Sequence, residues 1–166
     1  NNTSPAAYAG VISGTGGVAK IGSGTQIFSA TNTYSGGTTV SGTGTLTGST
    51  GAVFTGTQAG SFGTGSITVE TGATIRSSGA FVIGGGQNTT RTLNLNGGTA
   101  NITGAGTGGE YLRTINMTGG TITADSGTVY FRAPNGGGTA VASSAAASPS
   151  TIATRVDLTL GNLSAS

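Results

Sequence analysis

Short runs of β-branched and other apolar residues, separated by glycine pairs, recur along this sequence. Each run has only about 3 to 5 residues, which is short even for strands. The Gly-Gly, Asn-Gly, Ser-Gly and Thr-Gly pairs between the runs mark tight corners, because glycine adopts positive φ without steric cost. No segment offers apolar residues at helical spacing without a glycine interrupting it. The runs predicted as strands are 26–29, 38–40, 45–47, 66–69, 73–75, 81–83, 92–95, 101–103, 114–117, 121–123, 128–131 and 156–160.

An internal repeat indicates how these strands are arranged. Residues 93–103 match residues 115–123 in hydrophobic pattern and share a Gly-Gly-Thr corner, with an offset of 22 residues from Leu93 to Ile115. A weaker copy of the corner occurs at 36–38. A repeat of about 20 residues lies within the range of solenoid proteins. Very short strands with sharp corners favour a β-solenoid (parallel β-helix) over a sandwich, whose strands are longer.

The composition excludes several classes of protein. The chain has 34 Gly in 166 residues but only 3 Pro, and Gly does not recur at every third position, which excludes collagen. A hydrophobic fraction of 34% argues against disorder of the whole chain. There is no Cys and no His, so disulfides, Cys or His metal sites and Ser-His-Asp catalysis are impossible. We expect no cofactor and no metal.

The basic residues are dispersed rather than clustered. They make no run and are not interleaved with aromatics, so nucleic-acid binding is not expected. No stretch approaches the roughly 20 apolar residues that a membrane span needs. The six residues are Lys20, Arg76, Arg91, Arg113, Arg132 and Arg155.

An ordered string of glycine-rich motifs runs through the first half of the chain: GTGGVAKIGSGT at 14–25, NTYSGGTTV at 32–40, GTGTL at 42–46, FGTGSITV at 62–69 and GATI at 72–75. This string resembles the autotransporter-associated β-strand repeat family, and the resemblance covers about residues 10–83. It implies an all-β, right-handed parallel β-helix in an exported or surface-displayed bacterial protein. Members of the family are mostly stalks, adhesins and extracellular scaffolds, so the resemblance implies no enzymatic activity.

The carboxylates do not form a recognisable catalytic set. Glycosidases need two carboxyl groups across a cleft, whereas these lie in different repeats. We expect solvated charges, with Glu110–Arg113 and Asp125–Arg132 as surface ion pairs worth about 0–1 kcal/mol. No catalytic, cofactor-binding or metal-binding residue is predicted. The four carboxylates are Glu70, Glu110, Asp125 and Asp157.

Tyr34 lies within the repeat motif and has two interpretations. As a structural residue it would cover the core at a corner and hydrogen-bond through its hydroxyl group. As a carbohydrate-stacking residue it would need further exposed aromatics, for which Tyr111, Tyr130 and Phe131 are the candidates. We favour the structural role.

Polar residues within the repeats are expected to form ladders. The Thr-x-Thr steps, such as 43–47, are similar to those of ice-binding solenoids, but we expect no regular array because the steps do not recur in register along the sequence. Ordinary threonine ladders are predicted instead, since threonine favours strands. Asparagine ladders at turns are predicted for Asn32, Asn94, Asn96 and Asn116.

The chain divides into four segments by composition. Residues 1–9 form a polar lead and possible inter-subunit arm, 10–140 the solenoid, 141–153 an Ala/Ser-rich loop or linker, and 154–166 a terminal strand. Neither end has the cap that solenoids use to cover an open sheet edge. Two arrangements therefore stay open: flanking repeats of the same protein cover the ends, or copies stack head to tail into a filament.

These observations predict a non-enzymatic extracellular protein at the bacterial cell surface. The leading hypothesis is a structural β-solenoid building block of a surface or matrix fibre. The alternative is a passenger fragment of an autotransporter-type adhesin or a glycan-binding module. A polysaccharide-degrading β-helix enzyme is the third and weakest hypothesis.

Overall fold

The chain folds into three parallel β-sheets, and its described residues contain no helix. The computed structural model describes residues 7–48, 60–79, 82–84, 91–103, 110–126, 129–132, 140–143, 149–152 and 156–157. The first sheet contains, in spatial order, β2 (Val18–Lys20), β4 (Thr38–Val40), β6 (Ile67–Glu70), β8 (Thr92–Asn96), β11 (Thr114–Met117) and β14 (Ala140–Ser143). The second contains β1 (Ala7–Tyr8), β3 (Thr25–Phe28), β5 (Thr45–Gly48), β7 (Thr74–Ser77), β9 (Thr99–Thr103), β12 (Thr121–Ser126) and β15 (Thr151–Ile152). The third contains β10 (Glu110–Tyr111), β13 (Val129–Arg132) and β16 (Val156–Asp157).

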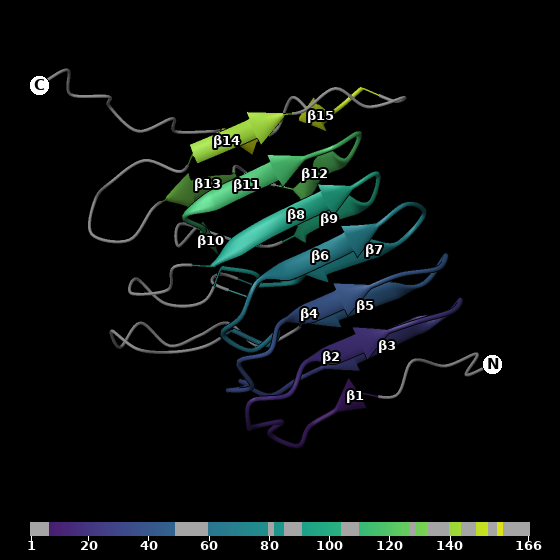
Figure 1. The fold of residues 1–166 in the computed structure, drawn as a ribbon, viewed down its shortest axis with the longest axis vertical. Coiled ribbons are helices and arrows are strands. Elements are labelled where there is room, and N and C mark those ends of the chain that lie inside the picture. Colours follow the sequence, from purple (N-terminus) through teal and green to yellow (C-terminus); the bar gives the residue numbers. More distant parts are fainter. Residues whose placement is uncertain are drawn as a thin grey trace, which may run out of the picture.

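These sheets are the sides of a stacked coil, which confirms the predicted all-β parallel β-solenoid. In Figure 1 the strands of the first sheet lie in front and run to the right, and those of the second lie behind and run back. The coils rise from the N-terminal to the C-terminal end, so the winding is right-handed (Figure 1), as parallel crossover connections almost always are. We number the coils from 1 to 6 by their first-sheet strands, β2, β4, β6, β8, β11 and β14.

Strand pairing confirms the repeat seen in the sequence. Ile115 pairs with Leu93 in parallel register, and Asn116 pairs with Asn94. The other coils are less regular, because the offset from Thr38 to Ile67 is 29 residues and that from Val18 to Thr38 is 20. The additional residues fall between the second-sheet strand of one coil and the first-sheet strand of the next. Coil length therefore varies on the third side, while the first two sheets keep their register.

Columns of apolar side chains fill the interior. Period-two alternation directs every second residue of a strand inward, and equivalent inward residues of successive coils stack. The first sheet contributes Ile67, Leu93 and Ile115 in one column. The adjacent column contains Val40, Val69, Leu95 and Met117, and the second sheet contributes Leu46, Ile75, Ala100 and Ile122.

The Gly-Gly-Thr corners have a geometric reason. Gly97 and Gly119 adopt φ values of 78° and 73°, a conformation that disfavours residues with a Cβ. The second glycine of each pair lies close to the coil below: a Cβ on Gly98 would be 2.6 Å from the Val69 carbonyl oxygen, and one on Gly120 would be 2.5 Å from Leu95 Cβ. The first glycine allows the turn and the second allows close stacking of the coils.

Two sequence-based assignments are corrected by the structure. Residues 82–84 form a turn rather than part of a strand at 81–83, because the N–H groups of Ile83 and Gly84 donate to a side chain instead of a neighbouring strand. The predicted loop or linker at 141–153 contains most of β14 and all of β15, which pair with β11 and β12. The first sheet thus includes β14 and the second includes β15, while residues 144–148 and 153 lie outside the described part.

Strand pairing also involves both ends of the described chain. β1, at the end of the polar lead 1–9, pairs with β3. β16, within the predicted terminal strand, pairs with β13. Both terminal segments thus contribute a strand to the solenoid.

Candidate functional site

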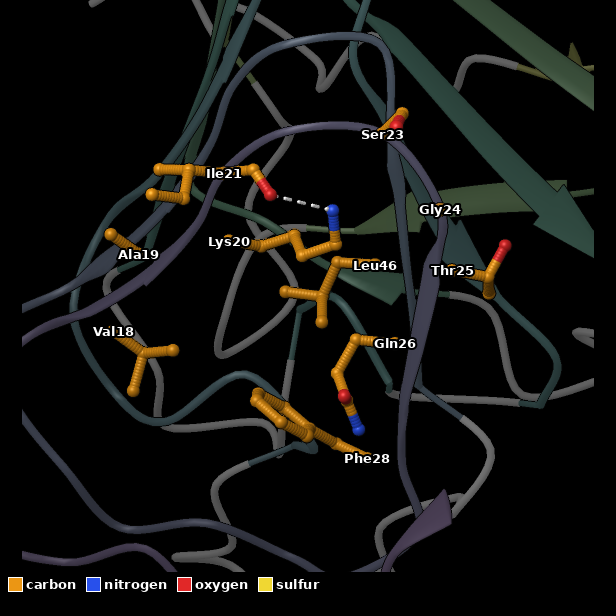
Figure 2. A pocket seen from close by; sticks show the side chains of 10 residues that line it. All are labelled: Val18, Ala19, Lys20, Ile21, Ser23, Gly24, Thr25, Gln26, Phe28 and Leu46. Carbon is orange, nitrogen blue, oxygen red and sulfur yellow. Dashed lines mark hydrogen bonds between the residues drawn. The ribbon is translucent and has the colours of Figure 1, made fainter. Parts of the chain in front are cut away.

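A hollow of about 370 Å³ lies at coil 1, lined by residues of that coil and by Leu46 of coil 2 (Figure 2). Val18, Gln26, Phe28 and Leu46 lie among its walls. Lys20 extends into it, and its Nζ donates to the carbonyl oxygens of Ile21 at 3.0 Å and of Gly22 at 3.2 Å. The ammonium group is thus held by backbone acceptors at the wall of the hollow.

The hollow is built from positions that belong to the solenoid core. Lys20 pairs with Val40 of the next coil and Gln26 pairs with Leu46, and both partners are fully buried. Two inward positions of coil 1 are therefore polar where coil 2 carries apolar residues, while a third, Val18, is apolar where coil 2 carries the buried Thr38.

The outer face of the second sheet carries a continuous threonine column, an ordinary threonine ladder of the kind predicted from the sequence. Successive parallel pairings align one threonine of each strand from β3 to β15. The neighbouring outward column is mixed, with Thr47, Arg76 and Asn101 in successive coils. The regular array is thus one residue wide. Its six members are Thr25, Thr45, Thr74, Thr99, Thr121 and Thr151.

Asparagine ladders form on the first sheet, as predicted for two of the four residues. Asn116 Nδ2 donates to Asn94 Oδ1 at 2.9 Å, on the outer face of the strands rather than at a turn. Asn96 Nδ2 instead donates to Glu70 Oε1 at 3.2 Å. Asn32 is buried, accepts from the N–H of Ile12 and donates to Ser61 O, so it joins three levels of the coil.

Tyr34 has the structural role that the sequence favoured. Its side chain is buried, and its hydroxyl group lies 2.5 Å from Thr38 Oγ1, which donates to Phe62 O. Burial is the largest effect on its phenol and raises the pKa above the usual 10.0. Phe131 is also buried, so neither ring is exposed for carbohydrate stacking, while the side chains of Tyr111 and Tyr130 lie outside the described part.

Glu110 contradicts the prediction of a surface ion pair with Arg113, because its side chain is completely buried. Its Oε1 lies 2.9 Å from Ser77 Oγ, and its Oε2 accepts the N–H groups of Ile83 at 3.0 Å and Gly84 at 2.8 Å. Glu110 belongs to coil 4 and its partners to coil 3. The carboxyl group therefore fastens one coil to the turn below it.

Arg91 is the second buried charged residue of this region. Its Nη1 donates to Ile83 O, so Ile83 is held through its N–H by Glu110 and through its C=O by Arg91. Among the described residues, the Arg91 Nε and Nη2 atoms find no hydrogen-bond partner. Burial lowers the pKa of Arg91 from 12.5 to about 10, with Tyr34 and Glu110 acting in the opposite direction, so it is a cation at neutral pH.

Sequence reasoning missed this buried cluster of Glu110, Arg91 and Ser77. The sequence offered one signal, the small number of charged residues. Because the chain has only four carboxylates, each of them could have been considered individually as a candidate for a buried role. The pair expected between Asp125 and Arg132 involves side chains outside the described part, as does the side chain of Asp157. Within the described ranges, no three carboxylate, His or Cys side chains gather where they could hold a metal ion.

Comparisons with protein-family models, curated proteins and solved structures found no match to this chain. Among the described residues, no helix has the length and apolar character to cross a bilayer. The described features of the chain are thus a parallel β-solenoid, a hollow at coil 1, a threonine column and a buried polar cluster.

Proposed function

We propose that this chain is a non-enzymatic structural segment of an extracellular fibre at the bacterial surface, in which the solenoid is a stiff spacer. The observation that carries the proposal is the unbroken parallel ladder of the first sheet from β2 to β14. Every inner strand of that ladder is bonded to a strand above and a strand below, so a bend must disturb backbone hydrogen bonds in several coils at once.

The use of polar residues supports a structural role. The buried groups Asn32, Tyr34 and Glu110 bond to neighbouring coils rather than facing an accessible site. The exposed ladder of Asn94 and Asn116 also links coils. Most of the polar side chains described above therefore form hydrogen bonds within the solenoid, which favours a scaffold over a catalyst.

The proposed partner is a further coil that packs against coil 1. The hollow there presents Val18, Lys20 and Gln26, which lie in register with core columns of the coils above. The further coil belongs either to flanking repeats of the same protein or to a second copy that stacks head to tail. The resemblance of residues 10–83 to autotransporter-associated repeats is consistent with both and supports an extracellular location for the proposed fibre.

Negative-stain electron microscopy at several protein concentrations tests the proposal. Long uniform filaments would support head-to-tail copies, and isolated short rods would support a segment of a longer stalk. Irregular particles, together with complete tryptic digestion of the native protein within minutes, would contradict both. Turnover of any member of a polysaccharide panel would replace the proposal with a β-helix enzyme, and saturable binding without turnover would replace it with a glycan-binding module.

A further inference from the structure

The single hydroxyl hydrogen of Ser77 has two acceptors in reach. Ser77 Oγ lies 2.8 Å from Gly79 O and 2.9 Å from Glu110 Oε1. A serine hydroxyl donates only one hydrogen bond, while it can accept two. If Glu110 were a carboxylate, one of these short contacts would bring two oxygens together without a hydrogen between them.

A proton on Glu110 Oε1 resolves this conflict. Oε1–H then donates to Ser77 Oγ, and the Ser77 hydroxyl donates to Gly79 O. The other carboxyl oxygen, Oε2, still accepts the N–H groups of Ile83 and Gly84. Every described polar contact of the carboxyl group is satisfied in this form.

We propose that Glu110 is a proton-dependent latch, whose neutral carboxyl group fastens coil 4 to Ser77 and to the turn at 82–84 of coil 3 and whose ionisation loosens that attachment. On ionisation the proton between Oε1 and Ser77 Oγ is lost to solvent. Ser77 must then donate either to Glu110 or to Gly79 O, and one of the two attachments is broken. The latch is independent of whether the chain forms a fibre.

Two titratable groups lie near the latch, and their charges bear on the protonation of Glu110. Arg91, which directly precedes β8, favours the ionised form by its charge, but its side chain donates to Ile83 O and, within the described part of the chain, makes no hydrogen bond to the carboxyl group. Tyr34, which precedes β4, is neutral at physiological pH because burial raises the pKa of its phenol. Among the described residues these are the titratable groups that face the region from other elements.

Burial has the largest effect on the pKa of Glu110. It raises the pKa of Glu110 from 4.5 to about 7, against hydrogen bonds from Gly84, Ser77, Ile83 and Val82 that act in the opposite direction. The folded chain therefore keeps this proton at pH values where the unfolded chain has released it. The resulting stabilisation is complete below pH 4.5 and is lost as the pH rises through about 7, by linkage between proton binding and folding.

Carbon-13 NMR of the glutamate side-chain carboxyl carbons tests the proton directly. The chain has two glutamates, Glu70 and Glu110, so Glu70→Gln assigns both signals. We expect the Glu110 signal of the folded chain to titrate near pH 7. A Glu110 signal that is already that of a carboxylate at pH 5.5 would overturn the proposal.

Denaturant unfolding as a function of pH tests the latch. The chain has no histidine and four carboxyl groups, so few other groups titrate between pH 4.5 and 7.5. The unfolding equilibrium constant of the wild type should increase on the order of 100-fold over that range, because tenfold corresponds to each pH unit by which the two pKa values differ. Stability that instead rises with pH would contradict the latch.

Glu110→Gln separates the proton from the shape of the side chain. Its amide is permanently neutral, and it can donate to Ser77 Oγ while its oxygen accepts from Ile83 and Gly84. We expect this variant to lose most of the pH dependence, and the control Glu70→Gln to keep it. A Glu110→Gln variant as pH-dependent as the wild type would refute the proposal, and if the variant does not fold, the NMR titration of the wild type still decides.

Discussion

Replacement of Gly98 by alanine tests whether the second glycine of a Gly-Gly-Thr corner is required for coil stacking. A Cβ at Gly98 would lie 2.6 Å from both Val69 Cγ1 and Val69 O, and 2.8 Å from Glu70 O. Gly16, in the corner before β2, provides the matched control, because a Cβ there meets nothing within 4 Å. Neither glycine has a positive φ, so the comparison isolates the steric contact.

The size of the effect follows from these distances. Ordinary contact begins at 3.4 Å, so the corner must move by about 0.8 Å from the coil below. Thr99 N donates to Ala73 O at 3.0 Å next to the corner, and such a movement would take that bond beyond hydrogen-bonding range. Overpacking costs about 1–3 kcal/mol and the lost bond about 1 kcal/mol. We therefore expect Gly98→Ala to lower the free energy of unfolding by about 2–4 kcal/mol.

The control substitution should have the opposite sign. Gly16→Ala reduces the freedom of the unfolded chain and is expected to stabilise by about 0.4–1 kcal/mol. Urea unfolding followed by circular dichroism measures both variants, compared at equal m-values. If the two variants differ from each other by less than about 0.5 kcal/mol, a value typical of neutral surface changes, close stacking at the corner is not what selects the glycine.

The remaining predictions concern buried side chains, each with an exposed control measured by the same urea unfolding. Leu93→Ala opens a cavity in the middle of a core column and should cost about 2–5 kcal/mol, whereas Thr39→Ala on the outer face should change stability by less than about 0.5 kcal/mol; equal effects would contradict the assigned inward column. Tyr34→Phe removes the hydroxyl group that lies 2.5 Å from Thr38 Oγ1 and should cost about 1–2 kcal/mol, while Tyr8→Phe, on an exposed ring, should be neutral. A neutral Tyr34→Phe would show that the phenol does not contribute to the buried network.

Local features of the sequence were sufficient to predict the architecture. Strand position follows from alternation within three to six residues, and corners follow from glycine pairs such as Gly97-Gly98. The 22-residue offset also gave the register of β8 and β11, because the same offset separates β9 from β12 and the sequence pattern repeats in both sheets. The turn at 82–84 was predicted as part of a strand because Val82 and Ile83 are apolar. In the structure the Ile83 N–H group donates to Glu110, a contact that the local sequence does not reveal.

The polar clusters depended on which residues the winding brings together. Threonine ladders were predicted, but the members of the threonine column were not, because the offsets of 20 residues from Thr25 to Thr45 and 29 from Thr45 to Thr74 hide its register in the linear sequence. The Asn94–Asn116 ladder was foreseen because it falls in the regular repeat. The residues of a polar contact could thus be named where the sequence itself repeats, as at Asn94 and Asn116, and not where the offset between coils changes, as between Thr45 and Thr74.

The sequence by itself determined that the chain is an all-β solenoid, because alternation and glycine corners act within a few residues. Only the tertiary structure decided that Glu110 and Arg91 are buried while Lys20 borders an open hollow. A charged residue in a short strand has the same local pattern whether it faces solvent or the interior. Its environment, and with it the affinity of Glu110 for a proton, is set by the residues of the coil below, which are 26 to 33 positions away.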